Sequence, residues 1–186
     1  MNFDIKDFKN PYLKDLDEYR HMYEKSVTDP SSFFLEHALK ELDWFEKPSV
    51  GYSGKITKPT WFRDGVLNIS HNCIDRHAAK NPNKTAIIWQ GDEKENTKNI
   101  SYDQLLTEVS KLANGLKSIG VKKGDRVCIY MPMIPEAAYS MLACMRIGAI
   151  HSVVFGGFSP EAISSRILDS DCQYVITADE GIRGGK

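Results

Sequence analysis

Hydrophobic positions in the second half of the chain alternate between short continuous runs and helical spacing. Short runs rich in apolar and β-branched residues predict strands at Thr85–Trp89, Lys98–Ile100, Val127–Met131, Ile150–Phe155 and Tyr174–Thr177. Amphipathic spacing predicts helices at Ile69–Lys80, Ser101–Ile119, Pro135–Ile147 and Ser159–Ser170. This alternation indicates βαβ crossovers and an α/β fold with a partly parallel sheet flanked by helices.

Helix ends in this region carry recognisable signals. Ser101 and Gln104 have the spacing of a capping box, and Gly120 follows the last apolar position of the same helix. Ser159 is placed to cap the last helix, with Pro160 in its first position. These signals predict where both helices begin and where the longer one ends.

Residues 1–66 have a weaker pattern. A surface helix is expected around Leu16–Val27, and a second helix should begin after Asp29 as N-cap and end near Trp44. The prolines and glycines within Lys47–Pro59 predict that this segment is irregular. We interpret residues 1–66 as a helical and irregular N-terminal extension packed on residues 67–186.

Composition narrows the class of protein. The chain has 186 residues, of which 41% are hydrophobic, and this composition favours a globular protein. Its formal net charge of -1 creates no overall electrostatic attraction to nucleic acid or anionic lipid. Arg146 and His151 interrupt the most apolar stretch, Ala137–Phe158, and Met1–Asn10 lacks an apolar signal core. The 4 cysteines form no CxxC motif. We therefore expect a cytoplasmic protein with reduced thiols and no membrane or nucleic-acid partner.

Most catalytic and metal motifs are missing from the sequence. No two of the 5 histidines have the i, i+4 spacing of a helical metal site. There is no G-x-S-x-G elbow, no G-x-x-x-x-G-K-[ST] loop and no G-x-G-x-x-G fingerprint. We expect no catalytic residue and no metal ligand in this chain.

Two glycine-containing segments follow predicted strands, where α/β folds bind ligands. In the loop Phe155-Gly156-Gly157, glycine allows close approach or positive φ, and the next helix could offer free N–H groups to an anion or a polar chain. The alternative is a tight turn that needs glycine only for packing. Arg183-Gly184-Gly185-Lys186 could wrap a phosphate or form a solvated polar loop. The chain stops directly after these residues, and we therefore expect that it is truncated within a ligand site.

Several collinear segments resemble the N-terminal part of AMP-forming acetyl-CoA synthetases, in the adenylate-forming acyl-CoA synthetase superfamily. The most specific are Tyr130–Ala138 (YMPMIPEAA), Phe155–Ala162 (FGGFSPEA) and Ile176–Lys186 (ITADEGIRGGK). Further matches are Asp29-Pro30, Leu42–Trp44, Thr60–Phe62, Asn72–His77, Thr85–Trp89, Gly124–Val127 and Met141–Ser152.

The resemblance implies an enzyme that makes acetyl-CoA from acetate, ATP and coenzyme A through an acetyl-adenylate, with ATP and Mg bound outside this chain. It implies that Arg183, Gly184, Gly185 and Lys186 bind the nucleotide end of coenzyme A, and that Phe155, Gly156 and Gly157 lie near its pantetheine. Residues 67–186 would be the truncated first subdomain of the AMP-binding domain, an inactive fragment prone to self-association. The alternatives are a propionyl-CoA synthetase fragment and a stand-alone, non-catalytic module that binds coenzyme A or a protein.

Overall fold

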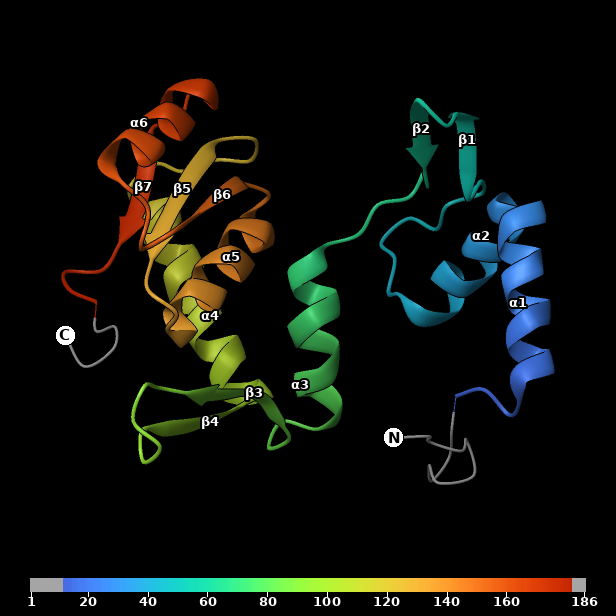
Figure 1. Ribbon diagram of the computed structural model, residues 1–186, viewed down its shortest axis with the longest axis horizontal. Helices are drawn as coiled ribbons and strands as arrows, with labels where there is room; N and C mark the ends of the chain where they lie inside the picture. The colour runs from blue at the N-terminus through green and yellow to red at the C-terminus, as the bar shows by residue number, and fades with distance from the viewer. Residues whose placement is uncertain (1–11, 182–186) are drawn as a thin grey trace. The chain divides into compact units, whose positions relative to one another are not determined.

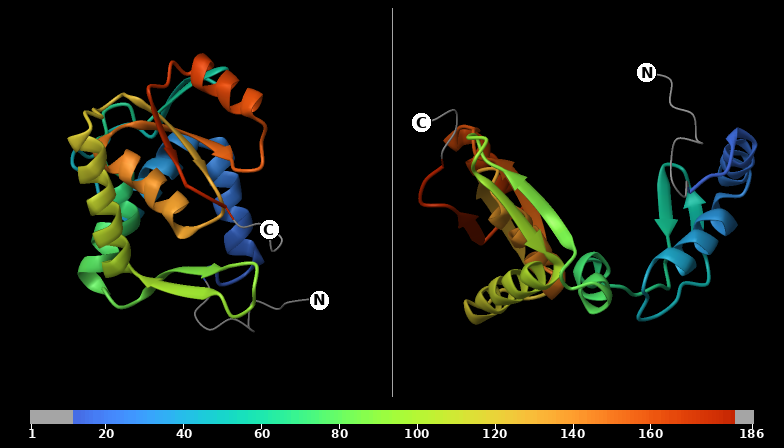
Figure 2. Two further views of the ribbon diagram at one scale, coloured as in Figure 1. Left: turned by 90° about the vertical axis from the view of Figure 1, so that its left-hand side faces the viewer. Right: turned by 90° about the horizontal axis from the view of Figure 1, so that it is seen from below.

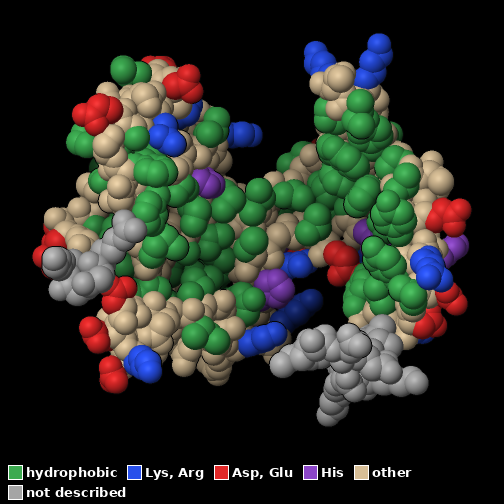
Figure 3. Space-filling model, viewed as in Figure 1, with side chains coloured by type: hydrophobic (Ala, Val, Ile, Leu, Met, Phe, Trp, Pro, Cys, Tyr) green, Lys and Arg blue, Asp and Glu red, His purple; other side chains and the backbone are tan. Residues whose placement is uncertain are grey.

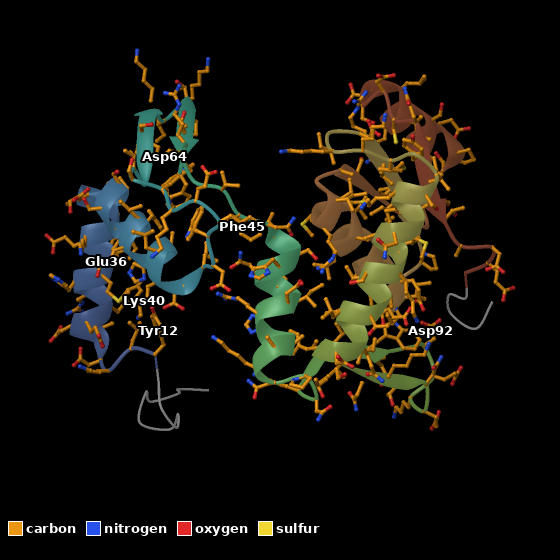
Figure 4. The ribbon with its side chains drawn as sticks, turned by 180° about the vertical axis from the view of Figure 1, so that it is seen from behind. Tyr12, Glu36, Lys40, Phe45, Asp64 and Asp92 are labelled. Atoms are coloured by element: carbon orange, nitrogen blue, oxygen red, sulfur yellow. The ribbon has the colours of Figure 1, made fainter. Side chains whose placement is uncertain are left out.

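The computed structural model describes residues 12–181, which divide between Leu67 and Asn68 into two compact units (Figure 1). The first unit begins with α1 (Leu16–Thr28) and α2 (Pro30–Glu41), as the sequence predicted. Asp29 caps α2 by accepting a 3.1 Å hydrogen bond from the Ser32 N–H. Lys25 of α1 forms a 2.8 Å ion pair with Glu36 of α2. Glu36 is labelled in Figure 4.

Helix α2 ends earlier than its apolar pattern suggested. Its last residue is Glu41, and Leu42 already has extended backbone angles. The Trp44 indole N–H turns back and donates a 2.8 Å hydrogen bond to the carbonyl of Ala38. Trp44 therefore contacts the helix from outside it, which explains why an apolar residue beyond the helix end continued the pattern.

The prediction of irregular chain over Lys47–Pro59 was wrong for its second half. Strands β1 (Tyr52–Lys55) and β2 (Lys58–Trp61) form an antiparallel hairpin. Proline is tolerated at position 59 because both strands of a two-stranded ribbon are edge strands. Gly54, opposite Pro59, has a φ of 90°, a backbone angle that favours glycine. The aromatic rings of Tyr52 and Trp61 pair across the ribbon with centroids 4.8 Å apart.

The second unit begins with a helical segment that is part π-helix and part α-helix. A π-helical turn, η2 (His71–Asp75), continues into α3 (Arg76–Lys80), which ends before Asn81-Pro82 as predicted. Strands β3 (Thr85–Gln90) and β4 (Thr97–Ser101) then form an antiparallel hairpin beside the start of α4 (Tyr102–Ser118), as Figure 2 shows.

Both ends of α4 have the predicted caps. Ser101 and Gln104 form the reciprocal bonds of a capping box. At the other end Gly120 has a φ of 100°, and its N–H bonds to the carbonyl of Lys117 while the Val121 N–H bonds to that of Leu116. This is a Schellman motif, which satisfies two of the terminal carbonyls.

A three-stranded parallel sheet, with the order β6-β5-β7, confirms the α/β prediction. Its elements are β5 (Arg126–Met131), α5 (Pro135–Ile147), β6 (Ile150–Phe155), α6 (Pro160–Asp169) and β7 (Tyr174–Thr177). Val127, Ile129 and Met131 of the central strand join α4 and α5 in the hydrophobic core. The crossover from β5 to β6 and the crossover from β6 to β7 run in opposite directions across the sheet. Because both crossovers are right-handed, α5 and α6 cover opposite faces of the sheet.

Candidate functional site

The loops that follow β5 and β6 meet at the carboxyl end of the sheet. The chain leaves β5 toward α5 on one face, and it leaves the adjacent β6 toward α6 on the other. Open α/β sheets bind their ligands in the crevice outside the carboxyl ends of their strands, so this end of the sheet is the candidate site. Of the predicted site residues, Phe155 ends β6, and Gly156 and Gly157 begin the second of these loops.

Residues Phe155 to Phe158 form a tight turn. The Phe158 N–H donates a 3.0 Å hydrogen bond to the carbonyl of Phe155. A Cβ atom on Gly156 would lie 3.1 Å from the carbonyl oxygen of Met131 and 3.3 Å from its carbon. Gly156 thus serves close backbone approach, and its φ is not in the positive range. The neighbour is the chain's own backbone, so Gly156 is needed for the packing of a tight turn, the alternative that the sequence analysis gave.

Tyr130, in the central strand, supports this turn. Its hydroxyl lies 3.0 Å from the carbonyl oxygen of Gly156 and 3.4 Å from that of Phe158. The sequence placed Tyr130 at the end of a strand but gave no sign of where its hydroxyl points. This contact spans 26 residues and depends on the register of β5 against β6.

Two further segments reach the same end of the sheet. The Trp89 indole N–H of β3 donates a 2.8 Å hydrogen bond to the carbonyl of Met133, which holds the loop after β5. A Cβ atom on Gly181 would lie 3.4 Å from the Cβ of Pro132. The chain after β7 therefore passes beside the loop after β5. The other predicted site residues, Arg183, Gly184, Gly185 and Lys186, lie outside the described residues.

Residues 160–162, in the first turn of α6, do not offer the free N–H groups that the sequence suggested. Pro160 has no N–H, and the Ser159 hydroxyl accepts the N–H of Ala162. Hydrogen bonds from the Glu161 N–H and from the Ser159 side chain hold the pKa of the Glu161 carboxyl below its ordinary value. The first turn therefore carries its own anion, which disfavours a second one there and leaves a neutral polar chain as the better ligand.

Aromatic side chains surround the turn. Phe155 and Phe158 are 40% and 48% exposed, and their ring centroids are 6.0 Å apart in an edge arrangement. The Arg166 guanidinium of α6 lies 5.3 Å from the centroid of the Phe158 ring. The site thus combines accessible apolar surface with main-chain amide groups, a combination that suits an extended chain of alternating methylene and amide groups.

An open cavity of about 630 Å³ lies at the opposite end of the strands and is not the candidate site. It is lined by the ends of α4 and α5 and the turn before β5, at residues Ser110, Ala113, Asn114, Lys117, Val121, Lys122, Lys123, Arg146 and Ile147. Its cations have a structural explanation, because lysine and arginine complement the negative ends of helices. Arg146 in addition is ion-paired with Asp75.

Metal ligands, membrane-spanning helices and reactive thiols are the other features to consider in residues 12–181. Within that range no three His, Cys, Asp or Glu side chains are grouped as metal ligands, and no helix has the length and hydropathy to cross a membrane. All four cysteines are free thiols. Burial raises the pKa of the Cys144 thiol to about 11, so this thiol stays protonated and unreactive at neutral pH.

Comparison with known proteins identifies the family of this chain. Residues 74–185 match the model of the AMP-binding enzyme family, and the chain belongs to that family. Within it, the similarity is to acetyl-coenzyme A synthetases, because residues 19–73 match the family described as "Acetyl-coenzyme A synthetase N-terminus". The resemblance seen in the sequence is thus confirmed.

Curated relatives carry the same name. The chain is 55% identical, over 97% of its length, to the acetyl-coenzyme A synthetase of Gamma-proteobacterium EBAC31A08. It is 56% identical to acetyl-coenzyme A synthetase 2 of Pseudomonas aeruginosa over 94% of its length, and 58% identical to that of Pseudomonas putida over 91%. It spans only 28%, 27% and 27% of the lengths of these relatives.

Proposed function

We propose that this chain is the N-terminal part of an AMP-forming acetyl-CoA synthetase. The observation that supports this proposal best is the identity of 54 to 58% with acetyl-coenzyme A synthetases over 91 to 97% of this chain. In the proposed reaction, a carboxylate oxygen of acetate displaces diphosphate from ATP to form acetyl-adenylate. The thiol of coenzyme A, losing its proton, then displaces AMP to give acetyl-CoA.

The contribution proposed for this chain is part of the coenzyme A site. Arg183 and Lys186, with Gly184 and Gly185 between them, would bind the phosphates of the nucleotide end, because arginine offers a bidentate fork and lysine a point charge. Phe155–Gly157 would contact the pantetheine. The aromatic surface and the occupied start of α6 support a neutral chain at this turn. ATP, Mg and acetate would be bound by residues outside this chain, which contributes no catalytic residue.

Neither alternative is favoured by the comparisons. The relatives named above are acetyl-coenzyme A synthetases, which favours acetate over propionate as the acyl substrate. They are also several times longer than this chain, which speaks against a stand-alone module. Steady-state rates of the full-length enzyme with acetate and with propionate test the first alternative. Calorimetric titration of this chain with coenzyme A tests the second, because tight binding would favour a module.

The coenzyme A assignment is tested by Arg183→Ala in the full-length enzyme. Losing a charge-assisted contact to phosphate should raise the KM for coenzyme A by about tenfold or more. Acetate-dependent ATP–diphosphate exchange should be unchanged, because that half-reaction does not use coenzyme A. Lys94→Ala, in the exposed turn between β3 and β4, is the control and should change neither value. An equal fall in exchange with Arg183→Ala would contradict the assignment.

Self-association of this chain in isolation is also proposed. The outer strands β6 and β7 each have one edge that no other strand of the described chain pairs. Both strands expose apolar side chains beside these edges, including Val153 at 51% and Val175 at 49%. In Figure 3 hydrophobic side chains gather on the visible face of the unit that holds this sheet.

A further inference from the structure

We propose that Tyr130 is a positioning residue for the coenzyme A site, acting through the turn Phe155–Phe158. The inference rests on the proposed function, because it assumes that this turn contacts the pantetheine. Tyr130 itself would not contact the ligand. Its role would be to hold two peptide groups of the turn in one orientation.

Tyr130 is well placed to act as a fixed anchor. It lies in the central strand, where it is in register with Val154 of β6 and Thr177 of β7. The strand therefore cannot shift without breaking pairs on both sides. The hydroxyl is shared between the carbonyl oxygens of Gly156 at 3.0 Å and Phe158 at 3.4 Å. A phenol has one hydrogen to donate, so the shorter contact to Gly156 is the dominant one.

Fixing these carbonyl groups also fixes two N–H groups. In a trans peptide the N–H of the next residue points opposite to the carbonyl oxygen. The N–H groups of Gly157 and Ser159 therefore point away from Tyr130. In the described part of the chain, neither N–H donates to a backbone or side-chain acceptor. The turn thus presents two unused donors whose direction depends on the Tyr130 hydroxyl.

The two donors match the chemistry of pantetheine. Its extended arm carries amide carbonyl groups that accept hydrogen bonds from backbone N–H groups. The occupied start of α6 removes the competing option of an anion at this turn. We therefore infer that Tyr130 sets the affinity of the site for the pantetheine arm and not for the nucleotide end.

The test is Tyr130→Phe in the full-length enzyme, which removes the hydroxyl and keeps the ring. The KM for coenzyme A should rise by about fivefold, the effect expected of a weakened pair of neutral hydrogen bonds. Acetate-dependent ATP–diphosphate exchange and the melting temperature should stay within error of the unmodified enzyme. Tyr174→Phe is the matched control, since the Tyr174 hydroxyl in the same sheet forms no hydrogen bond with any described residue.

A shorter substrate separates the two parts of the site. Pantetheine 4′-phosphate carries the thiol and the amide arm but lacks the nucleotide end. Tyr130→Phe should raise its KM by the same factor as that for coenzyme A, whereas Arg183→Ala should raise only the KM for coenzyme A.

Each remaining outcome has a distinct meaning. If Arg183→Ala raises the KM for coenzyme A and Tyr130→Phe does not, the positioning role is wrong while the proposed function stands. If neither variant changes it, the coenzyme A assignment of this chain is wrong. A parallel loss of exchange in Tyr130→Phe would show a general structural role and overturn the inference.

Discussion

The ion pair between Asp75 and Arg146 joins two helical segments that are distant in sequence. The guanidinium donates two hydrogen bonds, from Nη1 to Oδ2 at 2.7 Å and from Nη2 to Oδ1 at 2.8 Å. Both side chains are only 27% exposed. The Asn68 side-chain amide adds two 3.1 Å bonds to the carbonyls of Met145 and Arg146. This group of contacts fastens the beginning of the unit to the end of α5.

Replacing Asp75 by Asn should destabilise the protein by about 1–3 kcal/mol at pH 7, because it leaves the partly buried Arg146 without its counter-ion. Urea unfolding curves measure this change. Asp171→Asn is the matched control, since Asp171 pairs with Arg126 at 2.6 Å but is 82% exposed. That variant should lose less than about 0.5 kcal/mol. Equal losses in the two variants would contradict the importance of burial.

The same pair predicts a pH dependence. Hydrogen bonding to Arg146 lowers the pKa of Asp75 below its ordinary value. The pair therefore stabilises the folded state fully above the unfolded pKa of about 4, and this contribution is lost as the pH falls through the folded pKa. The difference in stability between the original protein and Asp75→Asn should shrink below pH 4. Unfolding curves at pH 7, 5 and 3 measure it, and a constant difference would count against the assignment.

Residue contacts differ in how well the sequence predicts them. The caps at Asp29, Ser101 and Ser159 involve residues three positions apart, so local pattern was enough to find them. The bond from Tyr130 to Gly156 and the pair of Asp75 with Arg146 join residues 26 and 71 positions apart. Such contacts depend on strand register and helix placement, which one sequence does not specify.

At the scale of elements, α4 offers the clearest test of a local signal. Replacing Ser101 by Ala removes the hydroxyl that accepts the Gln104 N–H at 3.2 Å and should cost about 1 kcal/mol. Ser101→Thr keeps an oxygen in the same place and should lose much less. Urea unfolding of both variants gives the comparison, and equal losses would show that the capping box is not the source of the effect.

Elements of the second unit were predicted almost completely because periodicity and turn residues agreed. Helix α5 and strand β6 have the predicted bounds, Pro135–Ile147 and Ile150–Phe155. The hairpin β1–β2 was missed because its residues, which include Gly54 and Pro59, do not alternate in hydrophobicity. One aromatic pair, Tyr52 with Trp61, packs across the ribbon, and this contact depends on the fold of the first unit and not on local propensity.

At the scale of the whole molecule, exposed apolar strands predict association of this chain in isolation. Sedimentation velocity from 1 to 100 µM should show a concentration-dependent shift toward dimers or larger species. Val153→Lys places a charge on β6 and should reduce the shift, since charged side chains on edge strands oppose edge pairing. Ile119→Lys, at an exposed position beyond α4, should leave it unchanged. A monomer at all concentrations would contradict the proposal.

The π-helical turn His71–Asp75 has a consequence for how the protein tolerates change. Such a turn carries an additional residue, which rotates everything that precedes it by about 100° relative to everything that follows. The two family matches meet at residues 73 and 74, inside this turn. Removing one residue there would leave a regular helix of nearly the same length. It would also put Asp75 and Asn68 out of phase, so that only one of them could still reach the end of α5. The turn thus acts as an angular spacer, and its length decides which of the flanking side chains can reach the end of α5.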